Sequence, residues 1–385
     1  MIKLNQSFSV LQVSLLSAFV LSSISCSSNS IYDNQSNNQI NSSASIYSSN
    51  ASIERANGIV EGDERGNEPK SRRNTNKLKL SGIRSLPALP IYAAFNNDYK
   101  GLFADNEPIA HADANNPDKF LYSLIASAKT SIDAAIFDID DPDATNAFIE
   151  AKKRGVTIRI VTDGDNLKDK TDPTKQRAAT ESLKSAGIPV HDDGNRGAFM
   201  HDKFIIVDNK WVWTGSYNLT TNAMFRDNNN VVMVNSPELA QNFNAEFKRL
   251  FEQGLFVANP HEIPNPLVTL NDKTTIKTFF SPGGGTKEAI TAELQKSTKS
   301  IKFMAFSFTD TDMAAILEQK KNTPGFQVEG ILDSCLISQY SIYNSLKQNK
   351  IFVKGDGNQA LMHHKTMIID DSIVITGSFN FSKNA

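Results

Sequence analysis

Two segments of this 385-residue chain carry the same polar residue types at the same spacing. In each segment four residues separate a His-x-Lys triplet from an Asp, and six more residues separate that Asp from Gly-Ser-x-Asn. The first copy contains His201, Lys203, Asp208, Ser216 and Asn218, and the second contains His363, Lys365, Asp370, Ser378 and Asn380. Because the whole pattern recurs with identical spacing, it predicts one kind of site that is built twice.

These residue types suit the chemistry of a phosphodiester. Lys and Asn side chains donate hydrogen bonds to non-bridging phosphate oxygens, and Lys adds a positive charge. One imidazole can attack phosphorus while a second protonates the leaving oxygen, because a histidine pKa of about 6.5 allows both protonation states. A single His cannot fill both roles at once, so two copies of the motif answer a chemical need. The lysines supply the positive charge that a metal often gives, and we expect neither a metal nor another cofactor.

Each motif is predicted to lie on a β-hairpin. Apolar stretches at 204–207 and 366–369 are typical of strands, and 211–214 and 373–376 are expected to return alongside them after short polar turns. Residues i and i+2 of a strand face the same side, so the His and Lys of each motif point together. The Ser and Asn that follow each returning strand pair in the same way.

The elements around the motifs also repeat, which predicts an α/β fold of two similar units. Hydrophobic patterns indicate helices at 118–128, 144–154 and 176–186, and again at 286–297, 312–321 and 341–348. They indicate strands at 131–139, 156–161 and 188–190, and again at 300–308, 326–332 and 351–353. The first unit continues with a strand at 231–234 and a helix at 238–251, and the second has no such continuation before Ala385. We therefore expect either a truncated gene product or an open sheet edge in the second unit.

The duplicated motif resembles that of the phospholipase D superfamily, over residues 86–385. The resemblance implies two phospholipase D-like units, each a mixed sheet covered by helices, related by a pseudo-twofold axis around one active site. It implies that His201 is the nucleophile and forms a phosphohistidine, and that His363 is the general acid, although the reverse assignment stays open. Many members of the family place a Glu near the position of Asn229, so this chain departs from the family there. The remaining roles implied are phosphate binding by Lys203, Lys365, Asn218 and Asn380, a lining by Ser216 and Ser378, and hairpin support by Asp208 and Asp370.

The N-terminal 26 residues resemble the signal peptide of a bacterial lipoprotein, with Cys26 as the lipidated residue. Cleavage without lipidation and an uncleaved anchor are the alternatives. Residues 27–85 are rich in Ser and Asn and predict a disordered linker. The first unit is then expected at 86–258 and the second at 259–385. We expect an exported protein that is lipid-anchored to a bacterial membrane or cell surface, with no obligatory oligomer.

The substrate is less closely defined by the sequence than the reaction. The net charge of −2 argues against a nucleic-acid-binding protein that is basic over its whole surface. We expect a phospholipase D that hydrolyses phospholipid headgroups, with transfer to an alcohol as a variant. The alternatives are a nuclease of the same superfamily, which needs a basic groove, and a catalytically impaired surface-binding protein.

Overall fold

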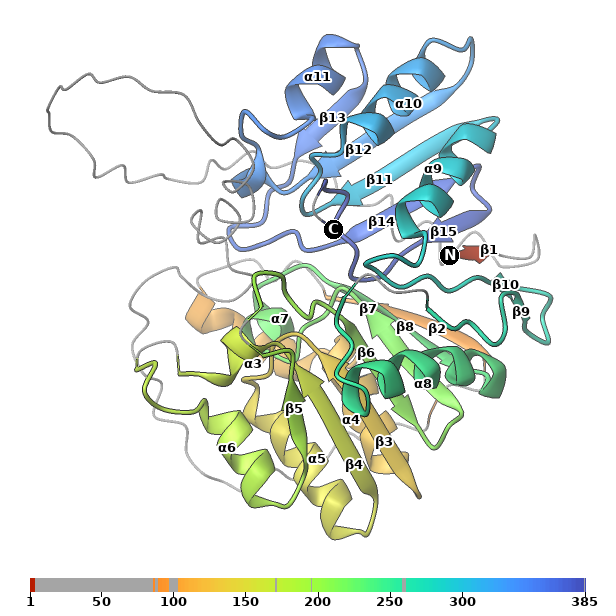
Figure 1. Cartoon of the computed structure of the whole chain (residues 1–385). Coiled ribbons are helices and arrows are strands. Elements are labelled where there is room, and N and C mark those ends of the chain that lie inside the picture. Colours follow the sequence, from red (N-terminus) through yellow and green to blue (C-terminus); the bar gives the residue numbers. More distant parts are fainter. Residues whose placement is uncertain are drawn as a thin grey trace, which may run out of the picture.

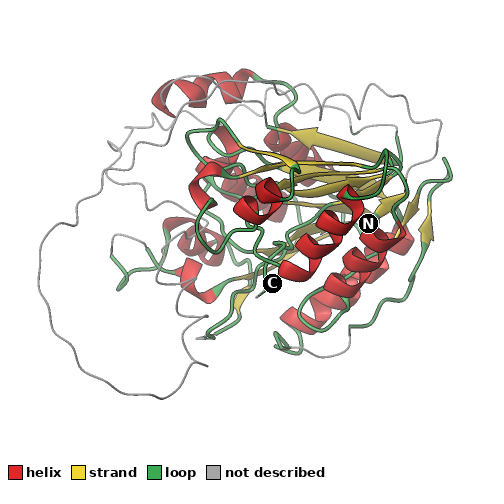
Figure 2. Ribbon diagram, turned by 90° about the horizontal axis from the view of Figure 1, so that it is seen from above, coloured by secondary structure: helices red, strands yellow, loops and turns green. Residues whose placement is uncertain are grey.

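The computed structural model describes residues 1–3, 86, 89–96, 103–169, 172–194, 196–257, 261–383 and 385. Two mixed β-sheets form two units, and in Figure 1 the second unit lies above the first. Seen from above, helices flank the strands (Figure 2). The expected α/β architecture is confirmed for this part of the chain.

The first sheet has the strand order β2-β8-β7-β6-β3-β4-β5. β3 pairs with β4 in parallel and with β6 in antiparallel orientation, so the sheet changes direction beside the first motif. The strands are β2 (Ile91–Phe95), β3 (Ser131–Ile136), β4 (Thr157–Thr162), β5 (Val190–Asp192), β6 (Lys203–Val207), β7 (Trp211–Gly215) and β8 (Asn230–Asn235).

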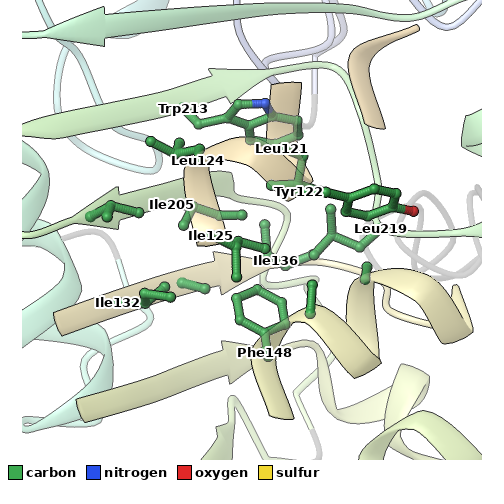
Figure 3. Packing of buried hydrophobic residues seen from close by; sticks show 14 of the residues in the cluster. Leu121, Tyr122, Leu124, Ile125, Ile132, Ile136, Phe148, Ile205, Trp213 and Leu219 are labelled. Atoms are coloured by element: carbon green, nitrogen blue, oxygen red, sulfur yellow. The ribbon is translucent and has the colours of Figure 1, made fainter. Parts of the chain in front are cut away.

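Helices cover both faces of the first sheet because its strands alternate between two apolar faces. Ile205 of β6 packs with α4 and α5, whereas its neighbour Phe204 packs with α8. Figure 3 shows the first of these clusters, where Leu121 and Phe148 of the two helices meet Ile136 of β3. The helices of this unit are α3 (Phe103–Ala112), α4 (Pro117–Ser127), α5 (Pro142–Lys153), α6 (Ala178–Ser185), α7 (Thr221–Phe225) and α8 (Pro237–Phe251).

The second sheet repeats the central order of the first, with β13-β12-β11-β14-β15 in the places of β5-β4-β3-β6-β7. Its buried residues form a core of their own with the helices of the second unit. The elements are α9 (Thr286–Lys296), β11 (Ser300–Ala305), α10 (Thr311–Lys321), β12 (Gln327–Leu332), α11 (Tyr343–Gln348), β13 (Phe352–Gly355), β14 (Lys365–Ile369) and β15 (Ile373–Ile375).

The edge beyond β15 is occupied by the N-terminal residues of the chain. Strand β1 (Ile2–Lys3) pairs antiparallel with β15 and with β10 (Thr275–Ile276), which in turn pairs with β9 (Val268–Thr269). β1 thus takes the place that β8 has in the first sheet, where the sequence predicts an open edge. The rest of the predicted signal segment, with Cys26, and the whole predicted linker lie outside the described residues.

The helices and strands expected from hydrophobic patterns are confirmed, with ends that differ by a few residues. The first long strand stops at Ile136 and not at 139, because Phe137 bonds by its backbone N–H to Asp202 outside the ladder. β1, β2, β9, β10, α3 and α7 were not predicted. Among the described helices, none has the length and apolar character needed to cross a bilayer.

Candidate active site

Each His-x-Lys triplet lies where a hairpin begins. Lys203 is the first residue of β6 and Lys365 the first of β14, and both side chains are almost fully buried. Each ammonium donates to the backbone carbonyl of the motif histidine, over 3.2 Å in the first unit and 3.1 Å in the second. The two copies therefore adopt the same local structure, as their identical spacing predicts.

An aromatic ring supports each pair. Phe137 lies 4.7 Å from the Lys203 ammonium and packs edge-on against His201, with ring centroids 5.0 Å apart. Phe306 repeats both contacts, at 4.5 Å from the Lys365 ammonium and 4.8 Å from the His363 centroid. These phenylalanines hold the imidazole and the ammonium at fixed positions relative to each other.

One cavity of about 1660 Å³ is lined by motif residues of both units. Its wall includes His201 and Lys203 of the first unit, and Lys365 and Asn380 of the second. Ser378 lines it as well, whereas Ser216, Asn218 and His363 are buried and do not line it. The structure thus brings the two hairpins to one shared space, which His201 and the motif lysines of both units line.

Asp208 and Asp370 lie at the opposite ends of the hairpins, away from the cavity. Asp208 accepts hydrogen bonds from the backbone N–H groups of residues 129–131, and Asp370 does the same with residues 298–300. Partial burial opposes ionisation of Asp208 and Asp370, but these bonds outweigh it and lower the pKa of both carboxyls. Both residues have positive φ, 53° and 52°, as the tight hairpin turn requires. They support the hairpins and do not face the reaction space.

Two buried carboxyl groups that sequence analysis missed hold the histidine segments in place. Asp163 accepts from the backbone N–H of Met200 at 2.9 Å, and Asp333 accepts from that of Met362 at 2.7 Å. Each Met directly precedes a motif histidine. Burial, reinforced by a neighbouring carboxylate, raises the pKa of both Asp163 and Asp333 to about 7. Each follows a buried strand directly, β4 or β12, and that repeated position is the signal that could have found them.

Asn229 makes a direct contact between the units. Its Oδ1 lies 2.8 Å from Nδ1 of His363, and it also accepts a hydrogen bond from Ser216 Oγ at 2.9 Å. Backbone bonds hold this seam together, because His363 N–H donates to the carbonyl of Asn228 and Asn228 N–H donates to that of Leu361. The residue that departs from the family pattern therefore contacts the second-unit histidine.

His364, the middle residue of the second triplet, points away from the reaction space, as the strand alternation predicts. Its Nδ1 lies 2.9 Å from Oδ1 of Asn230. Burial, together with the charges of His363 and Lys365, lowers the pKa of His364 to about 3, so it stays neutral near pH 7. It belongs to the packing between the units.

Within the described ranges, no three His, Cys, Asp or Glu side chains are grouped so that they could hold a metal ion. The cations and amides at the cavity are hydrogen-bond donors, which suits an anionic substrate directly.

Two α/β units that share a cavity lined by duplicated His-Lys motifs define a class of phosphate-handling protein. The family profile described as "Cardiolipin synthase, PLD-like domain" matches residues 121–251 and 290–385. The chain belongs to the phospholipase D superfamily.

Relatives of known name agree with this assignment. The chain is 32% identical to the mitochondrial cardiolipin hydrolase of Danio rerio over 145 residues, which are 38% of this chain and 61% of that protein. It is 35% identical to the human mitochondrial cardiolipin hydrolase over 135 residues, 35% of this chain and 50% of that one. It is 37% identical to a phospholipase D of Rickettsia conorii over 125 residues, 32% of this chain and 59% of the relative. The matched region thus spans between half and about three-fifths of the length of these relatives.

Among solved structures, a phosphatidylserine synthase of Haemophilus influenzae aligns with a TM-score of 0.52 and 11% sequence identity. The alignment covers 78% of this chain and 80% of the synthase. At this level of identity the likeness concerns the fold, and it extends over both units.

Proposed function

We propose that this chain is a phosphodiesterase of the phospholipase D type that hydrolyses phospholipid headgroups through a phosphohistidine. The observation that carries the proposal is the single cavity with His201 and Lys203 on one side and Lys365, next to His363, on the other. A phosphodiester bound there meets two ammonium groups from opposite units.

The reaction needs no group beyond these side chains. The lone pair of one imidazole attacks phosphorus and forms an N–P bond as the P–O bond to the headgroup breaks. The second imidazole, protonated, gives its proton to the leaving alcohol. That imidazole then takes a proton from water, whose oxygen attacks phosphorus and breaks the N–P bond. The products are the headgroup alcohol and a phosphomonoester, and both histidines return to their starting state.

The composition of the cavity wall favours a lipid over a nucleic acid. Phe199, Leu336 and Tyr340 line it, and Phe199 and Tyr340 are also exposed at the surface. Acidic residues lie among the basic ones, as Asp163 and Asp165 do near Arg196. A groove for nucleic acid needs a continuous basic track, which the acidic residues of this wall interrupt, whereas an apolar wall suits acyl chains. The names of the curated relatives, cardiolipin hydrolase and phospholipase D, support the same choice.

The test uses the purified chain with EDTA present. Vesicles containing phosphatidylcholine and cardiolipin are incubated in one arm, and single- and double-stranded DNA in another. We expect headgroup release and phosphatidic acid from vesicles, and loss of that activity by at least about 100-fold in His201→Ala and His363→Ala. Cleavage of DNA without lipid turnover would show the nuclease alternative instead. Silence in both arms would leave only a surface-binding role.

A further inference from the structure

The cavity that contains the motif residues is larger than a phosphate and its headgroup require. Its volume is about 1660 Å³, whereas sites for small molecules usually measure about 300–1,000 Å³. Space lined by polar groups holds water, but space lined by apolar side chains gains free energy when a hydrocarbon fills it. The side chains that line the remaining part of the cavity therefore indicate which further part of a substrate binds there.

Three phenylalanines form one part of the cavity wall. Phe204 lies on β6, Phe243 on α8 and Phe280 on the segment between β10 and α9. Their rings pack on one another, with centroids 5.1 Å apart for Phe204 and Phe243, 5.3 Å for Phe243 and Phe280, and 6.2 Å for Phe204 and Phe280. Phe204 directly follows Lys203, so the apolar surface begins one residue away from a motif lysine that lines the same cavity.

Aliphatic side chains from both units complete this part of the wall. Ile2 of β1 and Ile276 of β10 are paired residues of neighbouring strands, and Val232 of β8 joins them from the first unit. In Figure 1 α8 lies at the boundary between the units, close to β9 and β10. These side chains belong to one buried cluster, which is separate from the cores of the two units. We call this region the apolar pocket, and it is formed by Ile2, Phe204, Val232, Phe243, Ile276 and Phe280.

The buried arginine at this cavity is already paired. Arg249 donates two hydrogen bonds to the Glu246 carboxylate, at 2.8 and 3.0 Å, and one to the carbonyl of Val257 at 3.2 Å. Lys277, which also lines the cavity beside Ile276, is exposed to solvent. Arg249 therefore serves the fold and requires no second phosphate, and the six apolar side chains define the ligand of the pocket as a hydrocarbon.

We infer that the apolar pocket binds an acyl chain of the substrate while the phosphodiester lies at the motif lysines. This inference rests on the proposed function and names the part of the lipid that the cavity selects. A diester whose chain fills the pocket gains binding free energy for each methylene group that leaves water. The length of the acyl chain thus determines affinity in addition to the phosphate.

Alkyl phosphates of increasing length test the inference without depending on turnover. Butyl, hexyl, octyl and decyl phosphate are titrated calorimetrically into the unaltered chain, each below the concentration at which it forms micelles. We expect the dissociation constant to fall by about 4-fold for each added methylene group until the pocket is full. The same affinity for all four lengths would overturn the inference.

Release of headgroups from vesicles, measured beside these titrations, separates the inference from the proposed function. Turnover combined with length-independent binding would leave the proposed function intact and overturn the acyl-chain pocket. Length-dependent binding without any turnover would overturn the proposed function and leave the pocket as a hydrocarbon-binding site.

Thr278 offers a variant that tests where the hydrocarbon lies. Ile276, Thr278 and Phe280 alternate along the chain, and all three line the cavity. Thr278→Trp places a large ring there, so it should weaken the binding of decyl phosphate on the order of 100-fold, and that of butyl phosphate much less. Thr278→Val is the matched control, because it keeps the size of the side chain, and among the described residues Thr278 Oγ1 is buried without a hydrogen-bond partner. It should retain the dependence on length.

Tyr340 provides the alternative position for the hydrocarbon. It lines the same cavity but is 61% exposed. Length dependence that is lost in Tyr340→Ser and kept in Thr278→Trp would place the hydrocarbon at the surface and overturn the inference. Should Thr278→Trp fail to fold, as circular dichroism would show, the length series with the unaltered chain and with Tyr340→Ser still decides between the two positions.

Discussion

At the scale of single residues, burial determines the pKa of the two carboxyl groups that hold the histidine segments. Asp163 and Asp333 each accept backbone hydrogen bonds that favour the carboxylate, yet burial outweighs these bonds and raises the pKa of both groups to about 7. A folded-state pKa above the unfolded value of 3.8 means that the folded chain holds the proton more tightly. Stability from these groups is thus fully present below about pH 4 and is lost as the pH rises to about 7.

Replacing either carboxyl with an amide should remove this pH dependence. Asn keeps a carbonyl oxygen for the backbone N–H of Met200 or Met362 but does not ionise. The unaltered chain should lose stability between pH 5 and pH 8 as the carboxyl ionises, whereas the Asn variants should not. We therefore expect the difference in unfolding free energy, variant minus unaltered chain, to rise by on the order of 1–3 kcal/mol over this range for Asp163→Asn and for Asp333→Asn. Urea unfolding at the two pH values measures this difference. Asp371→Asn, at a side chain that is 60% exposed, is the matched control. An unchanged difference across that range would contradict the assigned pKa shifts.

At the scale of elements, the hairpins are stabilised at the end remote from the reaction. Asp208 binds three consecutive backbone N–H groups of the loop before β3, and Asp370 binds the equivalent loop before β11. Asp208→Ala and Asp370→Ala should each destabilise the fold by about 1–3 kcal/mol, because three backbone N–H groups lose a charged acceptor and Ala disfavours positive φ. Activity per folded molecule should change little. A large loss of kcat without loss of stability, measured by urea unfolding beside the lipid assay, would instead place these residues in the reaction.

Local patterns explain which elements could be predicted from sequence. The hairpin strands alternate in hydrophobicity, and the i, i+2 geometry correctly pairs His201 with Lys203. Contacts between distant segments leave no such pattern. β1 is two residues long and pairs with strands more than 270 residues away, and Asn229 meets His363 across 134 residues. Each depends on how the two units pack, which no local periodicity encodes.

At the scale of the whole molecule, a buried charge cluster connects the helix that ends the first unit to the segment leading into the second. His261 lies 2.7 Å by Nδ1 from Glu246 Oε2 of α8 and 2.8 Å by Nε2 from the carbonyl of Pro282. Arg249 forms two hydrogen bonds to the Glu246 carboxylate. Asp202 interacts electrostatically with the same groups, and its burial together with the charge of Glu246 raises its pKa to about 7. The hydrogen bond to Glu246 raises the pKa of His261 despite its partial burial.

Because the pKa of His261 is higher in the folded chain than in the unfolded chain, protonation stabilises the fold. This stabilisation is fully present below pH 6.5, the pKa in the unfolded chain, and is lost as the pH rises through the pKa of the folded chain. His261→Gln can still donate to Glu246 but does not ionise. We expect this variant to be less stable than the unaltered chain at pH 6, by on the order of 1 kcal/mol, and the gap to narrow by pH 9. Urea unfolding followed at both pH values checks it. A gap that widens at high pH would contradict the assigned direction.

The N-terminal sequence predicts export and lipidation, and the processed chain would then begin at Cys26. Such a chain lacks Ile2 and Lys3 and therefore cannot form β1. We propose that the chain is processed at Cys26, and cleavage there removes Ile2 and Lys3 from the second sheet together with their hydrogen bonds to β15 and β10.

Expression in a bacterium with radiolabelled palmitate should label the chain, and Cys26→Ser should abolish the label. The unprocessed Cys26→Ser chain should then melt at a higher temperature than the processed one, because it keeps β1 at the sheet edge. Ile2→Asp in that unprocessed chain, which places a charge at a buried position, should cancel the advantage. Equal melting temperatures for all three chains would show that β1 contributes nothing to the stability of the second sheet.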